Sequence, residues 1–244
     1  MGVMREEKLH RSPRPLTPRE RMWVENFHAH ETPASLKLAA DYIDSLHLGD
    51  TVLEVGCAFG RVTNFLENKR DVVATGVDIN PAEINYAKEH YLHSKVDFAV
   101  MDGTQLEFPD NSFNAVVMLG IIGGVEPEIR ENLLAEAYRV ARSGGTVAIA
   151  EFKMNLDDPE RVKKYEEDRA ITGEWGSRIV RKGNKTLFIA KHFTEDELTH
   201  LLLGAGFCSI QLREHTVETA GIGDGIVEIR QQYTIWGVKP LNLL

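Results

Sequence analysis

Apolar runs of strand length alternate with longer segments of helical period between residues 51 and 152. Short runs rich in β-branched residues and bounded by Gly, Asp or Asn predict buried strands, and the segments between them predict helices. The predicted strands cover residues 52–55, 71–78, 96–101, 112–120 and 146–152. This alternation is typical of an α/β fold in which a doubly wound parallel sheet has helices on both faces.

The segments outside this core have patterns of their own. Three prolines and many charges within residues 1–20 predict a loose arm, and apolar spacing predicts helix over residues 21–48. After the core the sequence predicts a helix around residues 159–169, a hairpin turning at 182–185, a helix over 194–206, and strands at 208–214 and 231–238.

Capping residues indicate where two helices of the core begin and end. Asn80 is expected to cap a helix that starts at Pro81, with Glu83 closing a capping box. A helix over residues 135–142 is expected to end at the glycines that begin with Gly144.

The turn after the first predicted strand contains Gly56 and Gly60 and opens a helix. A glycine backbone lets a ligand approach the main chain and the N-terminus of the following helix. The dinucleotide-binding pattern G-x-G-x-x-G is not met, because Ala58 and Arg61 replace its second and third glycines. No Gly-Lys-Ser/Thr follows, which argues against a phosphate-binding P-loop. These features favour a nucleoside ligand without a pyrophosphate.

The segment Glu54-Val-Gly56-Cys57-Ala58-Phe-Gly60 resembles the E/D-x-G-x-G-x-G loop of class I S-adenosylmethionine (SAM) dependent methyltransferases. Ala58 replaces the middle glycine, so one backbone approach is expected to be slightly looser. Asp78 follows Gly56 by 22 residues and ends the second predicted strand. A carboxylate there can accept both hydroxyl hydrogens of a ribose.

The resemblance implies a seven-stranded, mostly parallel sheet whose last strand is antiparallel, with SAM as the cofactor. It is close over residues 38–152 and loose over 193–239. It also implies that Asp102 binds the adenine amino group, and that the strand at 112–120 ends at the methionyl part of SAM. Glu54 is expected either to support the glycine loop or to approach the ammonium group of SAM. The cofactor-binding residues expected are Glu54, Gly56, Cys57, Ala58, Gly60, Asp78, Ile79, Asp102, Gly103, Thr104 and Leu119.

Composition narrows the class of partner. The formal net charge of −9 disfavours nucleic acid, whose phosphates attract basic proteins. No apolar run is long enough to span a membrane. The two cysteines cannot build a disulfide framework and show no metal-binding spacing, so we expect a cytoplasmic protein without a metal.

We expect a SAM-dependent methyltransferase that moves a methyl group to a small-molecule acceptor by in-line displacement. An RNA or protein methyltransferase, or a SAM-binding protein without methyl transfer, are the alternatives. A general base is needed only where the acceptor starts protonated. The candidates are His28, Glu151 and His192, each of which has a structural role as its alternative.

We divide the chain into an N-terminal arm and lid helix at residues 1–35 and a SAM-binding domain at 36–244, with a lid insertion at 153–192. Because residues 51–152 build the sheet and bind SAM, the N-terminal segment 14–35 and the insertion 153–192 are expected to determine acceptor specificity. Residues 178–192 include several basic residues and no acidic one. They form either a solvated face or a clamp for an anionic acceptor.

Overall fold

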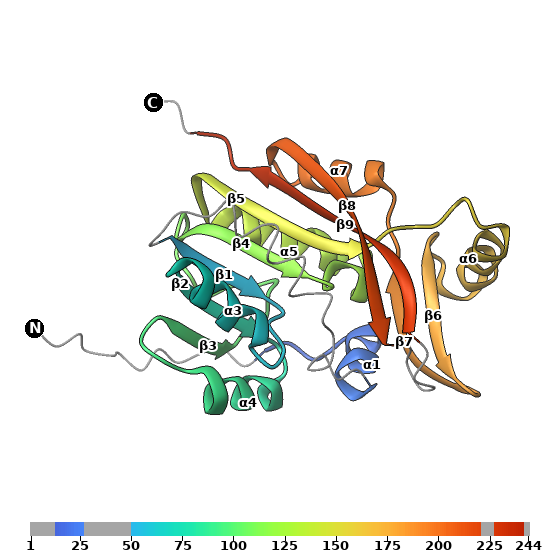
Figure 1. Ribbon diagram of the computed structural model, residues 1–244, viewed down its shortest axis with the longest axis horizontal. Helices are drawn as coiled ribbons and strands as arrows, with labels where there is room; N and C mark the ends of the chain where they lie inside the picture. Colours follow the sequence, from blue (N-terminus) through green and yellow to red (C-terminus); the bar gives the residue numbers. More distant parts are fainter. Residues whose placement is uncertain (1–12, 27–49, 221–226, 242–244) are drawn as a thin grey trace, which may run out of the picture.

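The computed structural model describes residues 13–26, 50–220 and 227–241. Figure 1 shows a twisted sheet with helices against it and a smaller group of elements at one end. The strands follow the order β3-β2-β1-β4-β5-β9-β8 across the sheet. They are β1 (Thr51–Val55), β2 (Val73–Asp78), β3 (Val96–Val100), β4 (Phe113–Leu119), β5 (Ala141–Phe152), β8 (Cys208–Ala220) and β9 (Val227–Val238).

Strand direction divides the sheet into two parts. Strands β1 to β5 are mutually parallel. Strand β9 lies between β5 and β8 and is antiparallel to both. Parallel neighbours require a crossover, and helices supply it along the first part of the chain. The predicted fold class is confirmed, including the antiparallel last strand.

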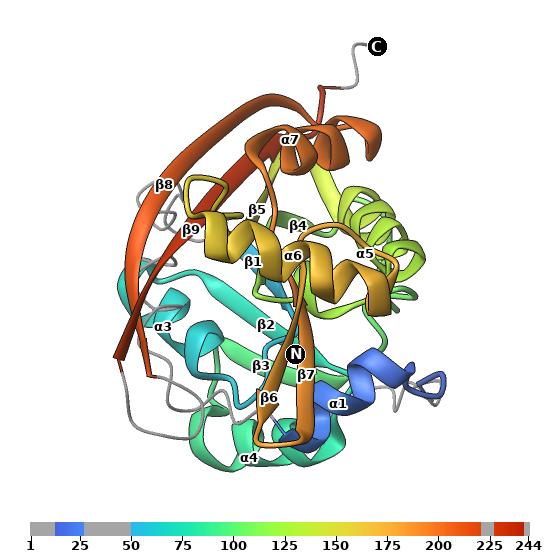
Figure 2. The same ribbon diagram turned by 90° about the vertical axis from the view of Figure 1, so that its right-hand side faces the viewer.

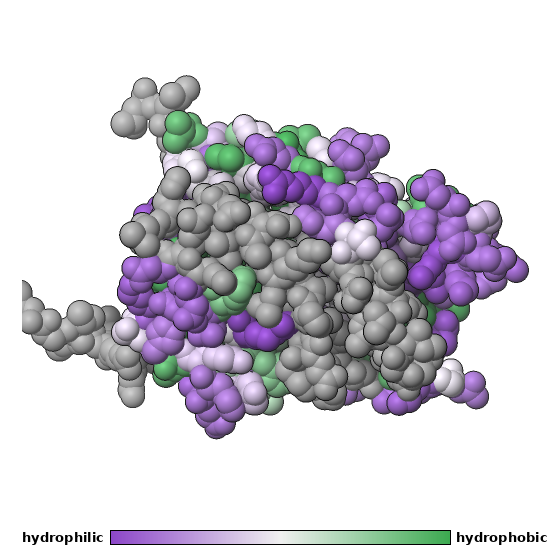
Figure 3. Space-filling view, in the orientation of Figure 1, coloured by the Kyte–Doolittle hydropathy of each residue, from purple (hydrophilic) through white to green (hydrophobic). Residues whose placement is uncertain are grey.

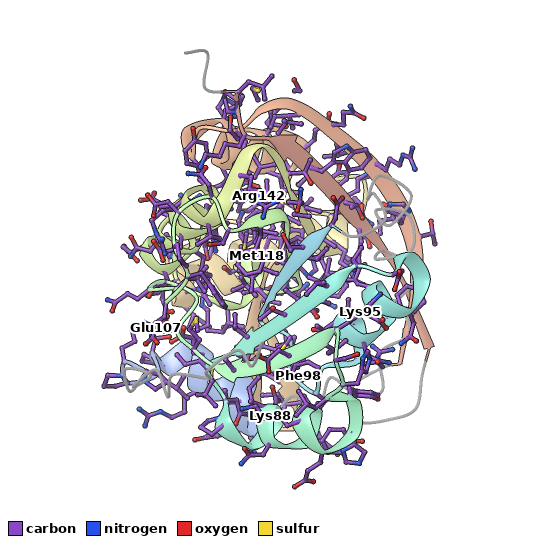
Figure 4. All side chains as sticks on the ribbon, turned by 90° about the vertical axis from the view of Figure 1, so that its left-hand side faces the viewer. Lys88, Lys95, Phe98, Glu107, Met118 and Arg142 are labelled. Atoms are coloured by element: carbon purple, nitrogen blue, oxygen red, sulfur yellow. The ribbon has the colours of Figure 1, made fainter. Side chains whose placement is uncertain are left out.

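Alternate side chains of each strand enter two different cores, as the period of two requires. Leu53 and Val55 of β1 pack on the face covered by α5 (Pro127–Val140) and α7 (Glu195–Gly204). Val52 packs on the opposite face, under α3 (Arg61–Arg70) and α4 (Pro81–Tyr91). In Figure 4 Met118 lies among the buried side chains, whereas Lys88 lies on the exposed side of α4.

A second group of elements lies beyond the carboxyl ends of the parallel strands (Figure 1). It consists of α1 (Pro18–Asn26), the short helix η2 (Ile122–Gly124), α6 (Pro159–Thr172) and the antiparallel strands β6 (Ser177–Lys182) and β7 (Lys185–Lys191). Strands β6 and β7 confirm the predicted hairpin. Figure 2 shows α1 beside it, and Figure 3 shows hydrophilic residues gathered over α6.

Trp23 joins α1 to the hairpin. Its Nε1 donates to the carbonyl oxygen of Ile189 at 2.9 Å, and its ring packs on Phe188 with centroids 4.1 Å apart. The loose arm predicted for residues 1–20 is therefore wrong over residues 13–20, where Arg19 and Glu20 are buried. The remainder of the helix predicted at 21–48 lies outside the described residues from position 27.

The predicted end of the helix at 135–142 is also wrong. Helix α5 ends at Val140, and Ala141 is already extended and begins β5. The glycines lie in an irregularity of β5 instead, where the register against β4 shifts. A Cβ on Gly145 would approach the carbonyl oxygens of Arg142 and Asn114 at 2.8 and 2.9 Å, so close backbone packing requires glycine there. Among the described residues, no helix is long and apolar enough to cross a membrane.

Candidate functional site

The glycine turn curls from the end of β1 over the end of β2. Gly56 N and Cys57 N both donate to the carbonyl oxygen of Val77, at 2.8 and 3.0 Å. Gly56 and Gly60 have φ angles of 76° and 79°, which glycine adopts without strain. Ala58, in place of the middle glycine, is also left-handed, with a φ of 47°. The turn therefore keeps a glycine-type conformation at a position that carries a Cβ.

Asp78 ties this turn to the start of the next helix. Its Oδ2 accepts the N–H of Ala58 and its Oδ1 the N–H of Asn80, both at 2.9 Å. Burial raises the pKa of Asp78, and these backbone bonds oppose the shift. Each carboxylate oxygen has a second lone pair, so the group can still accept hydroxyl hydrogens from a ligand.

Asn80 caps α4 as predicted, because its side chain accepts the N–H of Ala82 at 3.1 Å and Pro81 opens the helix. The capping box itself is wrong, since Asp78 takes the backbone N–H of Asn80 that Glu83 was expected to bind. Glu83 lines the pocket instead. Burial, followed by the nearby charge of Asp78, raises the pKa of Glu83 to about 8.

Asp102 follows β3 at the other side of the same opening. Its Oδ1 accepts both the N–H and the hydroxyl of Thr104, at 2.9 and 2.8 Å. Its Oδ2 is 3.1 Å from Nε of Arg14. Thr104 thus fixes Oδ1 of the Asp102 carboxylate, and Oδ2 faces the N-terminal segment.

A pocket at the carboxyl ends of the parallel strands brings many of the predicted residues together. Those that line it are Gly56, Ala58, Asp78, Ile79, Asp102, Gly103 and Leu119. Glu54, Cys57, Gly60 and Thr104 were also predicted but are not among its described lining residues. Lining residues that were not predicted as cofactor-binding include Arg14, Glu20, Val24, Glu83, Gly120, Ile121, Gly124, Val125 and Leu133.

Two predicted cofactor residues lie beneath the glycine turn and support it. Glu54 is buried and accepts the hydroxyl of Thr63 on α3. Burial raises the pKa of Glu54 to about 7, and the bond from Thr63 opposes this. Cys57 is also buried, and desolvation holds the pKa of its thiol well above the usual value, so it is a poor nucleophile.

Glu151, a candidate base, supports the wall of the pocket from behind. Its Oε1 accepts the N–H of Gly123 in η2 at 3.0 Å. Burial raises the pKa of Glu151 to about 7, while the Gly123 bond and the charge of Arg130 oppose the rise. It is not among the described residues that line the pocket.

His192, a second candidate base, is buried with its Nδ1 2.8 Å from the hydroxyl of Tyr165. It is likewise not among the described lining residues. His28, the third candidate, lies outside the described residues. The structure therefore places neither of the two described candidates at the pocket wall.

Three basic residues of the stretch 178–192 pair with carboxylates of α6 and α7. Asp168 pairs with Arg178 at 2.8 Å and with Arg181 at 3.5 Å, and Lys191 pairs with Glu197 at 2.7 Å. An acid-free segment thus acquires carboxylates from other elements. Neither Arg178 nor Arg181 is among the described residues that line the pocket, and the anionic clamp at these residues stays a prediction.

Comparison with known proteins agrees with this geometry. A family model described as a methyltransferase domain matches residues 52–145. A solved SAM-dependent methyltransferase from Methanosarcina mazei is 30% identical, with a TM-score of 0.72 over 82% of this chain and 96% of the other. The chain belongs to the class I SAM-dependent methyltransferases.

Relatives in this family are named for small-molecule acceptors. Phosphoethanolamine N-methyltransferase 3 of Arabidopsis thaliana is 30% identical over 54% of this chain and 27% of its own length. The 27-O-demethylrifamycin SV methyltransferase of Amycolatopsis mediterranei is 28% identical over 59% of this chain and 60% of its own length. The chain thus spans less than two thirds of these curated relatives.

SAM is the cofactor of this family. The 1,6-didemethyltoxoflavin-N1-methyltransferase of Burkholderia thailandensis, solved with bound S-adenosylhomocysteine, shares the fold at 18% identity and a TM-score of 0.62. The pocket described above offers carboxylate oxygens that can accept the hydroxyl and amino hydrogens of an adenosine ligand. Asp78 offers carboxylate oxygens, and among the described residues Asp102 Oδ2 is a buried acceptor without a hydrogen-bond partner.

Proposed function

We propose that this chain transfers a methyl group from SAM to a small-molecule acceptor. One observation carries the proposal: a single pocket joins the glycine turn, Asp78 and Asp102 to an apolar wall formed by Trp23, Ile121 and other residues. The polar side suits an adenosine ligand, and the apolar side suits the body of an acceptor. The names of the curated relatives support an acceptor of low molecular weight.

Each side of the pocket has its own role in this proposal. The turn at Gly56 and Ala58 brings bare backbone to the ligand, Asp78 receives the ribose hydroxyls, and Asp102 receives the adenine amino group. Leu119 and Gly120 border the methionyl part of SAM. When bound, SAM supplies a methyl group already activated on a positive sulfur, so the protein chiefly has to align the acceptor and exclude water.

The acceptor side of the pocket is formed by α1 and by the segment that follows β4. Its described residues are mostly apolar, namely Trp23, Val24, Ile121, Gly124 and Val125. Apolar and aromatic walls bind ligands through the removal of surface from water. The proposed acceptor therefore has an apolar or aromatic body. We place the reaction in the cytoplasm, which agrees with two cysteines that are both free thiols.

Two measurements test the proposed function. Calorimetry with S-adenosylhomocysteine should give saturable, one-site binding, and its absence would remove the chain from the SAM-binding members of the family. Incubation with methyl-labelled SAM and fractionated small-molecule extract should then transfer label to a compound identified by mass spectrometry. Label recovered in RNA or protein fractions alone would overturn the small-molecule assignment.

A further inference from the structure

Arg14 reaches the cofactor pocket from the N-terminal segment, far from the sequence motifs that build the rest of that site. It lines the pocket together with Asp102, and its Nε is 3.1 Å from Asp102 Oδ2. It stands between two prolines, Pro13 and Pro15, and the sequence around it resembles no binding motif. Its position depends entirely on how residues 13–26 pack.

Glu20 fixes the orientation of the Arg14 guanidinium. Its two carboxylate oxygens accept from both terminal nitrogens of Arg14, at 2.7 and 2.6 Å. Glu20 lies in the first turn of α1, and its carboxylate also accepts the N–H of Thr17 at 2.8 Å. A bidentate pair of this type holds a planar guanidinium in one direction, which a single bond would not do. The hydrogen bonds that Arg14 donates to Glu20 raise the pKa of Arg14, so the guanidinium remains a cation.

The contact between Arg14 and Asp102 is an ion pair without an aligned hydrogen bond. Within the described part of the chain, neither Arg14 Nε nor Asp102 Oδ2 has a hydrogen-bond partner, although both atoms are buried. Oδ1 of Asp102 is already used by Thr104. A buried carboxylate oxygen that a cation neutralises but no donor occupies is well suited to accept an N–H from a ligand.

We propose that Arg14 is a positioning residue for adenine recognition, which acts by pairing with Asp102 and holding its Oδ2 toward the 6-amino group. This inference rests on the proposed function. The cofactor site is then complete only when residues 13–26 are seated over it. Glu20, the partner of Arg14, and Trp23 both belong to α1, and Trp23 lines the acceptor side, so the proposal couples cofactor binding to the acceptor wall through α1.

The test compares S-adenosylhomocysteine with S-inosylhomocysteine, in which a 6-oxo group replaces the 6-amino group. Calorimetry on the full chain gives the dissociation constant of each ligand for the wild type, Arg14→Gln and Asp102→Asn. The matched control is Arg21→Gln, which makes the same change at an exposed position of α1, a few residues further along the same segment. The carboxylate of Asp102 should disfavour the 6-oxo analogue, because the analogue offers an acceptor where this site needs a donor.

We expect Arg14→Gln to weaken S-adenosylhomocysteine binding about five- to twentyfold, and to reduce the preference for adenine over hypoxanthine by about fivefold or more. Arg21→Gln should leave both values unchanged. The double variant Arg14→Gln/Asp102→Asn should bind no more weakly than Asp102→Asn alone, because Arg14 acts through Asp102.

Other results would overturn the inference. Equal weakening of both ligands would mean that Arg14 merely anchors α1, and tighter binding by Arg14→Gln would mean that it obstructs the site. Additive losses in the double variant would show that Arg14 acts independently of Asp102. If the wild type bound neither ligand, the proposed function would fail, whereas wild-type binding with an unchanged Arg14→Gln variant would reject this inference alone.

Discussion

Asp78 combines a structural and a proposed binding role in one carboxylate. Its two oxygens accept the backbone N–H groups of Ala58 and Asn80, which belong to loops after different strands. It therefore shapes the glycine turn from the side while it lines the pocket. A substitution there changes both the charge offered to a ribose and the position of the backbone around it.

Asp78→Asn is expected to weaken S-adenosylhomocysteine binding by about ten- to a hundredfold, the loss of a charge-assisted bidentate contact. Calorimetry measures the change, and thermal unfolding shows whether the variant is folded. The matched control is Asp157→Asn, at an exposed position outside the pocket. Wild-type affinity in a folded Asp78→Asn variant would remove Asp78 from the cofactor site.

The residues of the site that could be predicted from sequence are those fixed by local motifs. Gly56, Asp78 and Asp102 lie at or just after the carboxyl ends of β1, β2 and β3. A parallel sheet brings such ends together at one edge. Arg14 and Glu83 could not be predicted to line the pocket in the same way. The position of Arg14 depends on the packing of α1. Glu83 lines the pocket because Asp78, and not Glu83, accepts the N–H of Asn80.

At the scale of elements, the join between the glycine turn and α3 is tightly packed. Gly60 caps α3 in the left-handed conformation. A Cβ at this position would lie 2.6 Å from Phe98 Cε1 and 2.7 Å from Ala87 Cβ. Gly60 thus does not need to touch the ligand to be essential, since it lets α3 approach β3 and α4.

Gly60→Ala is expected to lower the free energy of unfolding by about 2–4 kcal/mol, through backbone strain and overpacking. Urea unfolding measures this loss. Gly204→Ala is the matched control, because no atom lies within 4 Å of a Cβ built there at the end of α7. It should keep or slightly raise the stability. Equal stability of the two variants would contradict the packing argument.

The elements predicted from sequence are correct where a hydrophobic period is long and wrong where tertiary contacts decide. The five parallel strands and the hairpin at β6 and β7 were predicted from apolar runs. The end of α5 was not, because glycine was interpreted as a helix stop although it serves an irregularity of β5. The arm before α1 was predicted to be loose from its prolines and charges, yet Arg14 pairs with Glu20 and Asp102, and Thr17 donates to Glu126.

Glu174 links three elements around the pocket wall. Its carboxylate pairs with Arg19 of α1 at 3.0 Å and with Arg130 of α5 at 2.9 Å, and both arginines are buried. Arg19 also donates to the carbonyl oxygen of Val125 at 3.0 Å. Removal of the carboxylate would leave two buried cations without this partner. We therefore expect Glu174 to hold α1 against the rest of the fold.

Glu174→Gln is expected to destabilise the seated position of α1 by about 1–3 kcal/mol. Hydrogen exchange should show faster exchange of the α1 amides, with little change in β1 or β4. The control is Glu166→Gln, an exposed glutamate on the adjacent helix α6. If α1 exchanged at the wild-type rate in Glu174→Gln, another contact would be holding it.

At the scale of the whole molecule, buried carboxyl groups with opposite pKa shifts define a pH window of stability. The arginines beside Glu174 hold its pKa below the usual value despite partial burial. Its contribution is present above the unfolded pKa and is lost as pH falls through the folded pKa. Burial instead raises the pKa values of Glu54 and Glu151 to about 7. Their contribution is present at low pH and is lost as pH rises through about 7.

The free energy of unfolding should therefore be largest at mildly acidic pH and fall towards pH 8.5, about 1.5 units above the folded pKa of Glu54. Each raised pKa of this size contributes about 1–3 kcal/mol to that fall. Glu54→Gln should flatten the decline, because a neutral amide at this buried position has no proton to lose and can still accept the Thr63 hydroxyl. Urea unfolding of the wild type, Glu54→Gln and the exposed control Glu89→Gln at both ends of the range checks this. A decline in Glu54→Gln as steep as in the other two would mean that the buried carboxyl does not set the alkaline limit.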